Sequence, residues 1–495
     1  MTKGLDQLTR EALDGGDPGE TVIDYDGRAF TRGWLRETAD GVIDILASIA
    51  TRPDGLGFVA RNRPWAIASV LGMIASRRTI SMIYSYQSPE ALAETITRLG
   101  LQAVVMCDED LSPPVREAAD REGIAVIAVD ETGAKLAIAG RANGAALEAE
   151  AEPCIRLLTS GTTGKPKHYP MSYAAIAGFA QDGAAGIGAR KIGIPMLFYY
   201  PLANISGAMT LLPPFLAGRS FILLDRFDVH RWRDFTVRYR SEQANLPPAG
   251  FGMVLDAGIP AEDLASVRLA TTGSAALDPS IQSAFEQKYG VKILTAYGAT
   301  EFAGTAAAWT EPLYDEWIDR KRGSVGRACP GVTLRAIDPE SGDVLPAGEV
   351  GVMDVQISRL GPDWIRTTDL GLIDEDGFVY LRGRADGAVM RGGFKVLPET
   401  IESVLLSHPQ VAAAAVVGVA DRRLGAVPVA LVQPASTAAP DPEALKDHIR
   451  RHLPATHVPT QLWIVARIPR TPSLKIDRAG VRAEAERRIT AAGAP

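Results

Sequence analysis

A run of glycine, hydroxyl and lysine residues directly after an apolar stretch constrains this chain more than any other feature. The short, largely apolar segment 154–158 predicts a buried strand. It leads into Thr159-Ser160-Gly161-Thr162-Thr163-Gly164-Lys165-Pro166-Lys167. The two glycines allow a ligand to approach the backbone, the hydroxyls offer hydrogen-bond donors, and the two lysines add positive charge. We therefore predict a loop that binds a polyanion, such as the phosphates of a nucleotide.

Two common phosphate loops are excluded by the spacing of this run. A Walker A loop needs a glycine where Thr159 stands and a serine or threonine where Pro166 follows Lys165. The G-x-G-x-x-G spacing of dinucleotide-binding folds and kinases is also absent. The remaining alternative is a flexible turn without a ligand.

Composition narrows the class of protein. A length of 495 residues predicts at least two domains, and 46% apolar with 22% charged residues is typical of a soluble globular protein. The net charge of −7 gives no reason to expect nucleic acid binding. The scattered cysteines Cys107, Cys154 and Cys329 favour a reducing compartment. With no signal-peptide core and no long apolar run, we expect a cytoplasmic protein without a membrane span.

The order of apolar runs predicts an α/β fold. Residues 57–60, 103–107 and 124–129 are short continuous runs typical of buried parallel strands, and 88–99 has the cap and proline of a helix. Further strand-like runs occupy 196–200, 221–224, 267–272 and 292–297. From about Gly326 the runs 332–337, 349–357 and 378–382 favour antiparallel strands. A smaller unit follows, with a predicted helix at 398–406, a strand at 411–417 and another helix that starts at 441–443.

The glycine-rich run resembles the signature of the acyl-adenylate-forming superfamily, which includes acyl-CoA synthetases, stand-alone adenylation enzymes and luciferases. Five further segments resemble motifs of that superfamily, in its order. They are Tyr297-Gly298-Ala299-Thr300-Glu301, Arg366-Thr367-Thr368-Asp369-Leu370-Gly371, Gly383-Arg384-Ala385-Asp386, Arg391-Gly392-Gly393-Phe394-Lys395-Val396 and Pro469-Arg470-Thr471-Pro472-Ser473-Leu474-Lys475-Ile476-Asp477-Arg478. Thr368 and Leu474 stand where the superfamily usually has glycine.

The resemblance implies a nucleotide site with defined roles. Thr300 would contact the α-phosphate, Glu301 would hold Mg²⁺, and Lys475 would bridge the attacking carboxylate and the α-phosphate. Asp369 would accept hydrogen bonds from the ribose hydroxyls, as an ionised carboxylate can. The full set of expected ATP or AMP contacts is Thr159, Ser160, Gly161, Thr162, Thr163, Gly164, Lys165, Lys167, Gly273, Ser274, Ala275, Tyr297, Gly298, Asp369 and Arg384.

The resemblance also implies the domain plan. A large N-terminal domain, 1–383, would combine layered α/β subdomains with a small β-rich part and hold ATP and the acyl pocket. Residues 384–386 would form a hinge centred on Asp386. A small mobile α+β domain, 387–495, would carry Lys475 and place Gly392 and Gly393 beside the pantetheine arm of the acceptor.

The expected acyl pocket contains Tyr199, Asn204, Asn245 and Met253 in apolar and aromatic surroundings. This setting favours a mid-sized hydrophobic or aromatic acid. Members of the superfamily that activate amino acids commonly have an aspartate near the position of Tyr199 to pair with the substrate ammonium, and this sequence has none there. Asn204 stands where many acyl-CoA synthetases have histidine, which leaves the acceptor open.

We therefore expect ATP-dependent activation of a carboxylic acid to acyl-AMP with release of pyrophosphate, followed by transfer to CoA. The alternatives are a stand-alone adenylating enzyme that passes the acyl group to a carrier protein or an amine, and a nucleotide-binding regulator without catalysis. His448 and His452, spaced as on one helix face, are interpreted as solvated.

Overall fold

The computed structural model describes residues 3–49, 55–140, 152–159, 167–188, 194–391, 394–421, 424–436 and 439–493. The chain divides into two units. The first takes in the described residues up to 239 together with 299–304, and the second takes in 240–298 and 305–493.

A seven-stranded sheet forms the centre of the first unit, in the order β7-β6-β5-β3-β4-β8-β9. The strands β6, β5, β3, β4 and β8 are parallel, as predicted for β3, β5 and β6, whereas the edge strands β7 and β9 run antiparallel to their neighbours. The strands are β3 (Leu56–Ala60), β4 (Ile80–Tyr84), β5 (Ala103–Cys107), β6 (Ala125–Asp130), β7 (Gly133–Ile138), β8 (Cys154–Thr159) and β9 (Lys167–Ser172).

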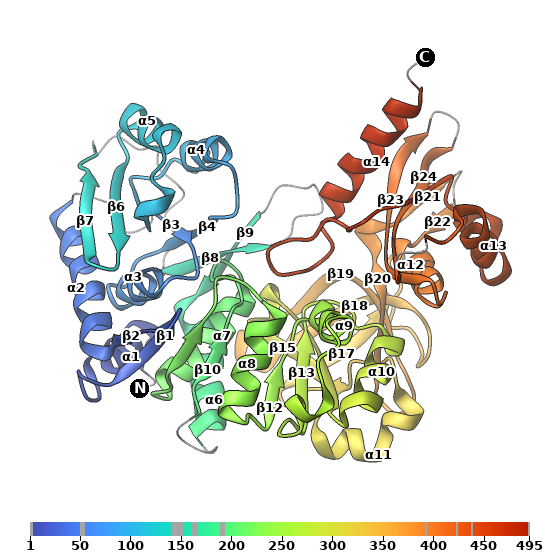
Figure 1. Cartoon of the computed structure of the whole chain (residues 1–495), viewed down its shortest axis with the longest axis horizontal. Coiled ribbons are helices and arrows are strands. Elements are labelled where there is room, and N and C mark those ends of the chain that lie inside the picture. Colours follow the sequence, from blue (N-terminus) through green and yellow to red (C-terminus); the bar gives the residue numbers. More distant parts are fainter. Residues whose placement is uncertain are drawn as a thin grey trace. The chain divides into compact units, whose positions relative to one another are not determined.

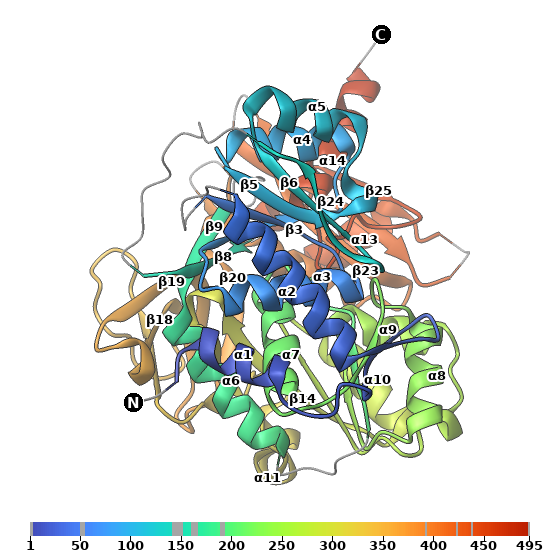
Figure 2. The same cartoon turned by 90° about the vertical axis from the view of Figure 1, so that its left-hand side faces the viewer.

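Helices cover both faces of this sheet, so its strands are apolar throughout. Along β5, Val105 and Cys107 face a cluster that includes α2 (Arg32–Ser48) and α3 (Pro64–Ala75). Val104 and Met106 face the opposite cluster, built with α4 (Pro89–Arg98) and α5 (Pro113–Glu122). Figure 2 shows α2 and α3 side by side and α4 beside α5. The predicted start of α4 is confirmed, because Ser88 accepts the cap hydrogen bond and Pro89 opens the helix.

A second, four-stranded sheet completes the first unit. Its order is β10-β11-β1-β2, with β10 and β11 parallel to β1. The strands are β1 (Thr21–Tyr25), β2 (Arg28–Thr31), β10 (Met196–Phe198) and β11 (Phe221–Leu223). The remaining helices of this unit are α1 (Leu5–Asp14), α6 (Tyr173–Gly188), α7 (Ile205–Leu216) and α8 (Val229–Tyr239), of which α6 and α7 pack together.

The next sheet runs β12-β13-β14-β15-β16 and belongs to the second unit, apart from residues 299–304. Its strands are β12 (Gln243–Asn245), β13 (Leu269–Gly273), β14 (Lys292–Ala299), β15 (Gly304–Ala308) and β16 (Arg327–Ala328). The strands β12, β13 and β14 are parallel, so their carboxyl ends meet at one edge. Three helices accompany them: α9 (Pro248–Asp256), α10 (Pro279–Tyr289) and α11 (Glu311–Lys321).

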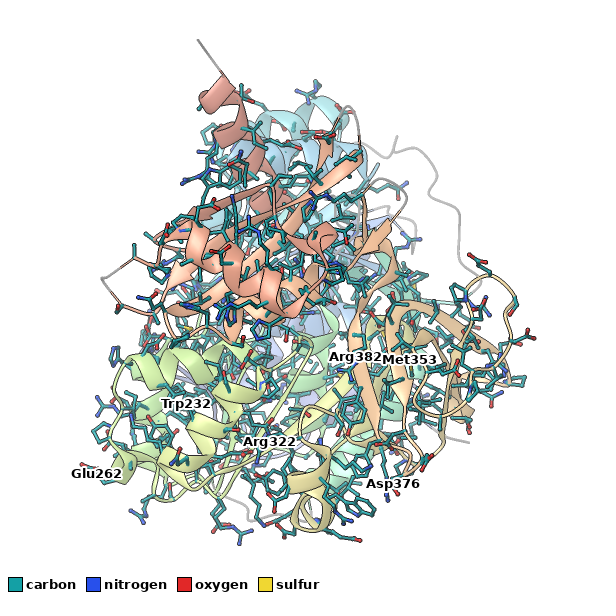
Figure 3. The ribbon with its side chains drawn as sticks, turned by 90° about the vertical axis from the view of Figure 1, so that its right-hand side faces the viewer. Trp232, Glu262, Arg322, Met353, Asp376 and Arg382 are labelled. Atoms are coloured by element: carbon teal, nitrogen blue, oxygen red, sulfur yellow. The ribbon has the colours of Figure 1, made fainter. Side chains whose placement is uncertain are left out.

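An antiparallel sheet of four strands follows in chain order, as the alternating pattern predicts. It comprises β17 (Val332–Ile337), β18 (Gly351–Ile357), β19 (Trp364–Ile373) and β20 (Val379–Arg384). Met353 on β18 and Arg382 on β20 mark this sheet in Figure 3. Asp369 and Arg384 are register partners across β19 and β20, which sets the first pair of predicted site residues side by side.

The last part of the chain is a five-stranded sheet with helices on both faces (Figure 1). Its strands are β21 (Val389–Arg391), β22 (Phe394–Val396), β23 (Val411–Asp421), β24 (Gly425–Pro434) and β25 (Gln461–Ile464). One face packs on α12 (Pro398–Leu406) and α13 (Pro442–His452), and the other on α14 (Arg478–Gly493). The predicted bounds of α12 are confirmed, whereas β23 extends beyond the predicted end because it forms a long hairpin with β24.

Two further properties concern the described residues as a whole. Among them, no helix combines the length and the apolarity that a bilayer crossing requires. Cys107 and Cys154 are buried, whereas Cys329 is partly exposed, and all three are free thiols.

Candidate active site

The predicted ribose residues converge on Asp369. The phenol of Tyr297, at the carboxyl end of β14, donates a hydrogen bond to Oδ2 of Asp369 across 2.6 Å. The guanidinium of Arg384 lies 3.7 Å from Oδ1 of the same carboxylate and donates to the hydroxyl of Thr368. Burial and the charge of Asp369 raise the pKa of Tyr297 above its ordinary value, so the phenol stays protonated and can donate.

Lys475 lies within electrostatic range of this group. Burial lowers the pKa of Lys475 below its ordinary value, and the charge of Arg384 lowers it further, while Asp369 opposes both. The structure therefore brings four predicted residues together within the second unit: Tyr297, Asp369, Arg384 and Lys475.

A tight hairpin presents the lysine. The backbone N–H of Thr471 donates to the carbonyl of Lys475, and Leu474 donates back to Thr471, each across 2.8 Å. Arg470 donates to the carbonyl of Leu474 from its side chain and forms an isolated bridge with Ile476. Leu474 has φ 61°, which is the left-handed conformation that the usual glycine adopts without strain.

Thr300 and Glu301 lie in the first unit, in a short 3₁₀ helix that also includes Phe302. Thr300 is buried and Glu301 is half-buried. The Glu301 carboxylate is near Tyr169 on β9, whose pKa is raised by burial and then by that negative charge. Ala303 ends the turn in the left-handed region at φ 50°.

The end of β13 and the turn after it carry three of the expected ATP or AMP contacts, Gly273, Ser274 and Ala275. A Cβ at Gly273 would lie 3.0 Å from the carbonyl oxygen of Ala296, so this strand end accommodates little more than a hydrogen. Ser274 follows with φ 69° and, like Ala275, is exposed. Gly298 is exposed at the end of the neighbouring strand β14.

Several predicted residues lie outside the described part of the chain. The backbone of Thr159 pairs with that of Lys167 where β8 ends and β9 begins. The residues outside the description are Ser160, Gly161, Thr162, Thr163, Gly164 and Lys165 in the signature run, and Gly392 and Gly393. Asp386 lies in the 3₁₀ turn Ala385–Gly387, and only its backbone is described.

Two expected acyl-pocket residues belong to the first unit. Tyr199 is 4% exposed; its ring stacks on Tyr200 at 4.7 Å and meets Phe227 edge-on at 5.2 Å. Asn204 caps α7 by accepting from the N–H of Gly207 at 3.2 Å. Its side chain is near the phenol of Tyr84, whose pKa is raised by burial and lowered by Asn204.

The other two expected acyl-pocket residues belong to the second unit. Asn245 is exposed at the carboxyl end of β12, and Met253 is half-buried on α9. In register, Asn245 stands beside Thr271 of β13, so two polar side chains mark this edge of the sheet.

Sequence reasoning missed two features of the C-terminal sheet. Arg478 forms ion pairs with Glu399 and Glu402 of α12; the signal was two acids three residues apart, which share a helix face. His452 is exposed, as predicted, whereas His448 is half-buried between the rings of His408 and His452, at 5.1 and 4.5 Å.

The sequence profile of the AMP-binding enzymes matches residues 11–356, and that of the AMP-binding enzyme C-terminal domain matches residues 400–475. The chain belongs to the AMP-binding enzyme family. This family assignment confirms the predicted superfamily, the α/β fold class and the class of AMP-forming carboxylate ligases, and it supports the use of ATP.

Known AMP-binding enzymes resemble this chain along most of its length. Sulfoacetate–CoA ligase of Cupriavidus necator is 31% identical over 347 residues, which span 66% of each protein. ATP-bound MatB from Rhodopseudomonas palustris shares the fold with a TM-score of 0.81 at 24% identity, covering 98% of this chain and 99% of MatB. The amide bond synthetase McbA from Marinactinospora thermotolerans has a TM-score of 0.77 at 27% identity, covering 97% of this chain and 99% of McbA.

Proposed function

We propose that this protein is an acid–CoA ligase that converts a mid-sized hydrophobic or aromatic acid to acyl-AMP and then to the acyl-CoA thioester. One observation carries the first step: a partly buried lysine shares its surroundings with the predicted ribose carboxylate, Asp369, and with Arg384. A cation at this position suits a reaction in which a carboxylate attacks a negatively charged phosphorus. The acid is already ionised at neutral pH, so no general base is needed.

The nucleotide would lie along the residues described above. Asp369 would accept the ribose hydroxyls with its remaining lone pairs, since each carboxylate oxygen has two and Tyr297 uses one. Lys475 would bridge the carboxylate of the acid and the α-phosphate. Thr300 would donate to the α-phosphate from its hydroxyl.

Glu301 fits the role of a Mg²⁺ ligand. Mg²⁺ is usually held by one or two carboxylates together with substrate phosphates and water, and a half-buried carboxylate at a strand end can supply one such ligand. When bound, the ion would neutralise charge on the phosphates that leave as pyrophosphate. The described residues contain no cluster of three His, Cys, Asp or Glu side chains suited to a metal, so phosphate and water would complete the shell.

The acyl group would contact the aromatic wall of Tyr199, Tyr200 and Phe227. Burial raises the pKa of both tyrosines, so this wall carries no charge near neutral pH. An uncharged aromatic surface favours an acid whose far end is apolar.

The acceptor proposal rests on the chemistry around Asn204. Its amide is not basic, and its oxygen already accepts the N–H of Gly207 as the cap of α7. A thiol, which is partly ionised near neutral pH, attacks without a protein base more readily than an ammonium does. This favours CoA. The second candidate is transfer to an amine or a carrier protein, and the similarity to the amide bond synthetase McbA supports the amine.

We also propose the domain plan set out above, with 1–383 as the nucleotide-binding body, a hinge at 384–386 and a mobile domain from 387 that carries Lys475 and faces the acceptor with Gly392 and Gly393. The short turn Ala385–Gly387 between β20 and β21 is a suitable place for a change of backbone direction.

The test is release of pyrophosphate across a panel of aryl, aliphatic and dicarboxylic acids, followed by a choice of CoA, a phosphopantetheinylated carrier or amines. We expect release with at least one aromatic or medium-chain acid and thioester formation with CoA. Lys475→Ala is expected to abolish adenylate formation and still consume supplied acyl-adenylate. No pyrophosphate with any acid would refute the proposal, and product only with amines would establish the second candidate.

A further inference from the structure

Arg478 makes a dense set of contacts just beyond the proposed catalytic lysine. One of its terminal nitrogens donates to Oε1 of Glu402 and to the backbone carbonyl of Val416, the latter at 2.6 Å. The other donates to Oε2 of Glu402 at 2.9 Å and to Oε1 of Glu399 at 3.2 Å. A bidentate guanidinium–carboxylate pair of this kind fixes both direction and distance.

Glu402 is itself held firmly. Its side chain is 10% exposed, and its Oε1 also accepts the backbone N–H of Val416 across 2.6 Å. Glu402 therefore joins α12 to β23, and Arg478 adds the first turn of α14 to the same point.

Only a short stretch of backbone separates Arg478 from Lys475, and hydrogen bonds restrain it. Arg478 opens α14, and Asp477 stands just before it, with its carboxylate accepting from the N–H of Gly480 at 3.0 Å. The N–H of Asp477 donates to the carbonyl of Pro469 at 3.0 Å, which closes the base of the lysine hairpin. A displacement of Arg478 is thus passed to Lys475 through the restrained backbone of the two residues between them.

The hairpin has a second anchor that does not involve Arg478. Ile468 is 1% exposed in the cluster under α14, and Ile476 packs against the same cluster. Loss of the arginine should therefore leave the domain folded while it releases the direction in which the lysine points.

We propose that Arg478 is a positioning residue for adenylation: through its pair with Glu402 it holds the lysine hairpin so that Lys475 reaches the α-phosphate. The inference rests on the proposed function, because it assigns Arg478 a role only through Lys475.

Arg478, Glu402 and Glu399 together form an ion-paired cluster, here called the clamp, and Glu399 links it to the segment just before the proposed hinge. Its Oε2 is buried and has no hydrogen-bond partner, and a Cβ at Gly383 would lie 2.6 Å from it. Gly383 also has φ 115°, a conformation that side chains rarely adopt, so this close approach requires glycine. The clamp that orients Lys475 thus contacts the backbone next to Arg384.

The experiment compares both half-reactions in Arg478→Ala, Arg478→Lys and the control Arg482→Ala, an exposed arginine one turn later on α14. A misplaced catalytic group loses about 100-fold in rate. We expect about that loss in the kcat of ATP–pyrophosphate exchange for Arg478→Ala, with the KM for ATP and the consumption of supplied acyl-adenylate within about threefold of wild type. Arg478→Lys keeps the charge but not the bidentate guanidinium, so its kcat should lie between those of Arg478→Ala and wild type. The kcat of Arg482→Ala should match wild type.

A double variant decides whether Arg478 acts through the lysine. Arg478→Ala should lower the residual exchange of Lys475→Ala no further, because the group that it positions is gone. A further loss in the double variant, or equal loss of both half-reactions in Arg478→Ala or Arg478→Lys, would overturn the inference. If Arg478→Ala does not fold, Arg478→Lys supplies the same comparison. Wild type without exchange would instead refute the proposed function.

Discussion

The phenol of Tyr297 donates to Oδ2 of Asp369 across 2.6 Å, so a side chain at the end of β14 orients the carboxylate on β19. Tyr297→Phe keeps the ring and removes the donor. A hydrogen bond to a charged group contributes about 1.5–3 kcal/mol. Because an untethered carboxylate must be ordered when ribose binds, we expect the KM for ATP to rise about tenfold with little change in kcat.

Pyrophosphate exchange at varied ATP measures this effect. Tyr380→Phe is the matched control, since Tyr380 is a half-buried phenol of β20 that lies in register with Leu372 rather than Asp369. An unchanged KM for Tyr297→Phe would show that Asp369 needs no tether.

The fall of the adenylation rate at high pH, its alkaline limb, should follow the deprotonation of Lys475. Its pKa lies below 10.5, first because of burial and then because of Arg384. The charged form dominates below that pKa, so kcat/KM for the free enzyme should be highest there and fall as pH rises through it, before pH 10.5. Tyr297 cannot produce this limb, because its pKa is raised.

Arg384→Met removes one cause of the lowered pKa of Lys475 and should move the limb to higher pH. The measurement is the pH profile of exchange at low ATP for both proteins. A limb at or above 10.5 in the wild type would contradict the burial of Lys475 as its cause.

The left-handed conformation of Leu474 predicts an inverted order of stability. Glycine is usually less favourable than alanine by about 0.4–1 kcal/mol through the unfolded chain, but a left-handed residue with a side chain costs about 1–2 kcal/mol. With φ 61° at this position, the free energy of unfolding of Leu474→Gly should exceed that of Leu474→Ala by about 1 kcal/mol. Leu474→Gly should therefore have the higher urea midpoint. Equal midpoints in urea would show that the hairpin relaxes around alanine.

The proposed hinge can be tested at Asp386. Proline fixes φ, so Asp386→Pro should restrict a change of backbone direction in the turn Ala385–Gly387. We expect adenylation within about threefold of wild type and transfer to the acceptor reduced by at least about tenfold. Normal overall turnover would place the hinge elsewhere. Single-turnover rates for the two half-reactions separate the outcomes.

The sequence predicts several buried elements of this fold because burial leaves apolar runs or an apolar helix face, although the buried strand β4 is missed. The strands at 103–107 and 332–337 and the helix at 398–406 have their predicted bounds. The edge strand β7 escapes prediction, since Lys135 and Leu136 are exposed and its pairing with β6 depends on a tight turn rather than on an apolar pattern. Edge strands carry a weaker signal for this reason.

The candidate site likewise contains residues that the sequence predicts and residues that it does not. Tyr297, Asp369 and Lys475 could be proposed because each lies in a contiguous motif. The pair of Arg478 with Glu402 could not, because its members are 76 residues apart and an arginine after a polar loop resembles any solvated arginine. Leucine itself gives no sign of the positive φ at position 474, and the one signal is that the superfamily usually has glycine there.

The different exposures of the three thiols should allow one cysteine to be labelled selectively. Cys107 and Cys154 are 1% and 2% exposed, whereas Cys329 is partly open to solvent. Burial raises the pKa of Cys329, so the thiolate is a small fraction near neutrality and mildly alkaline buffer should favour alkylation. A maleimide dye added to the native enzyme should therefore attach at a single point without any cysteine being engineered away.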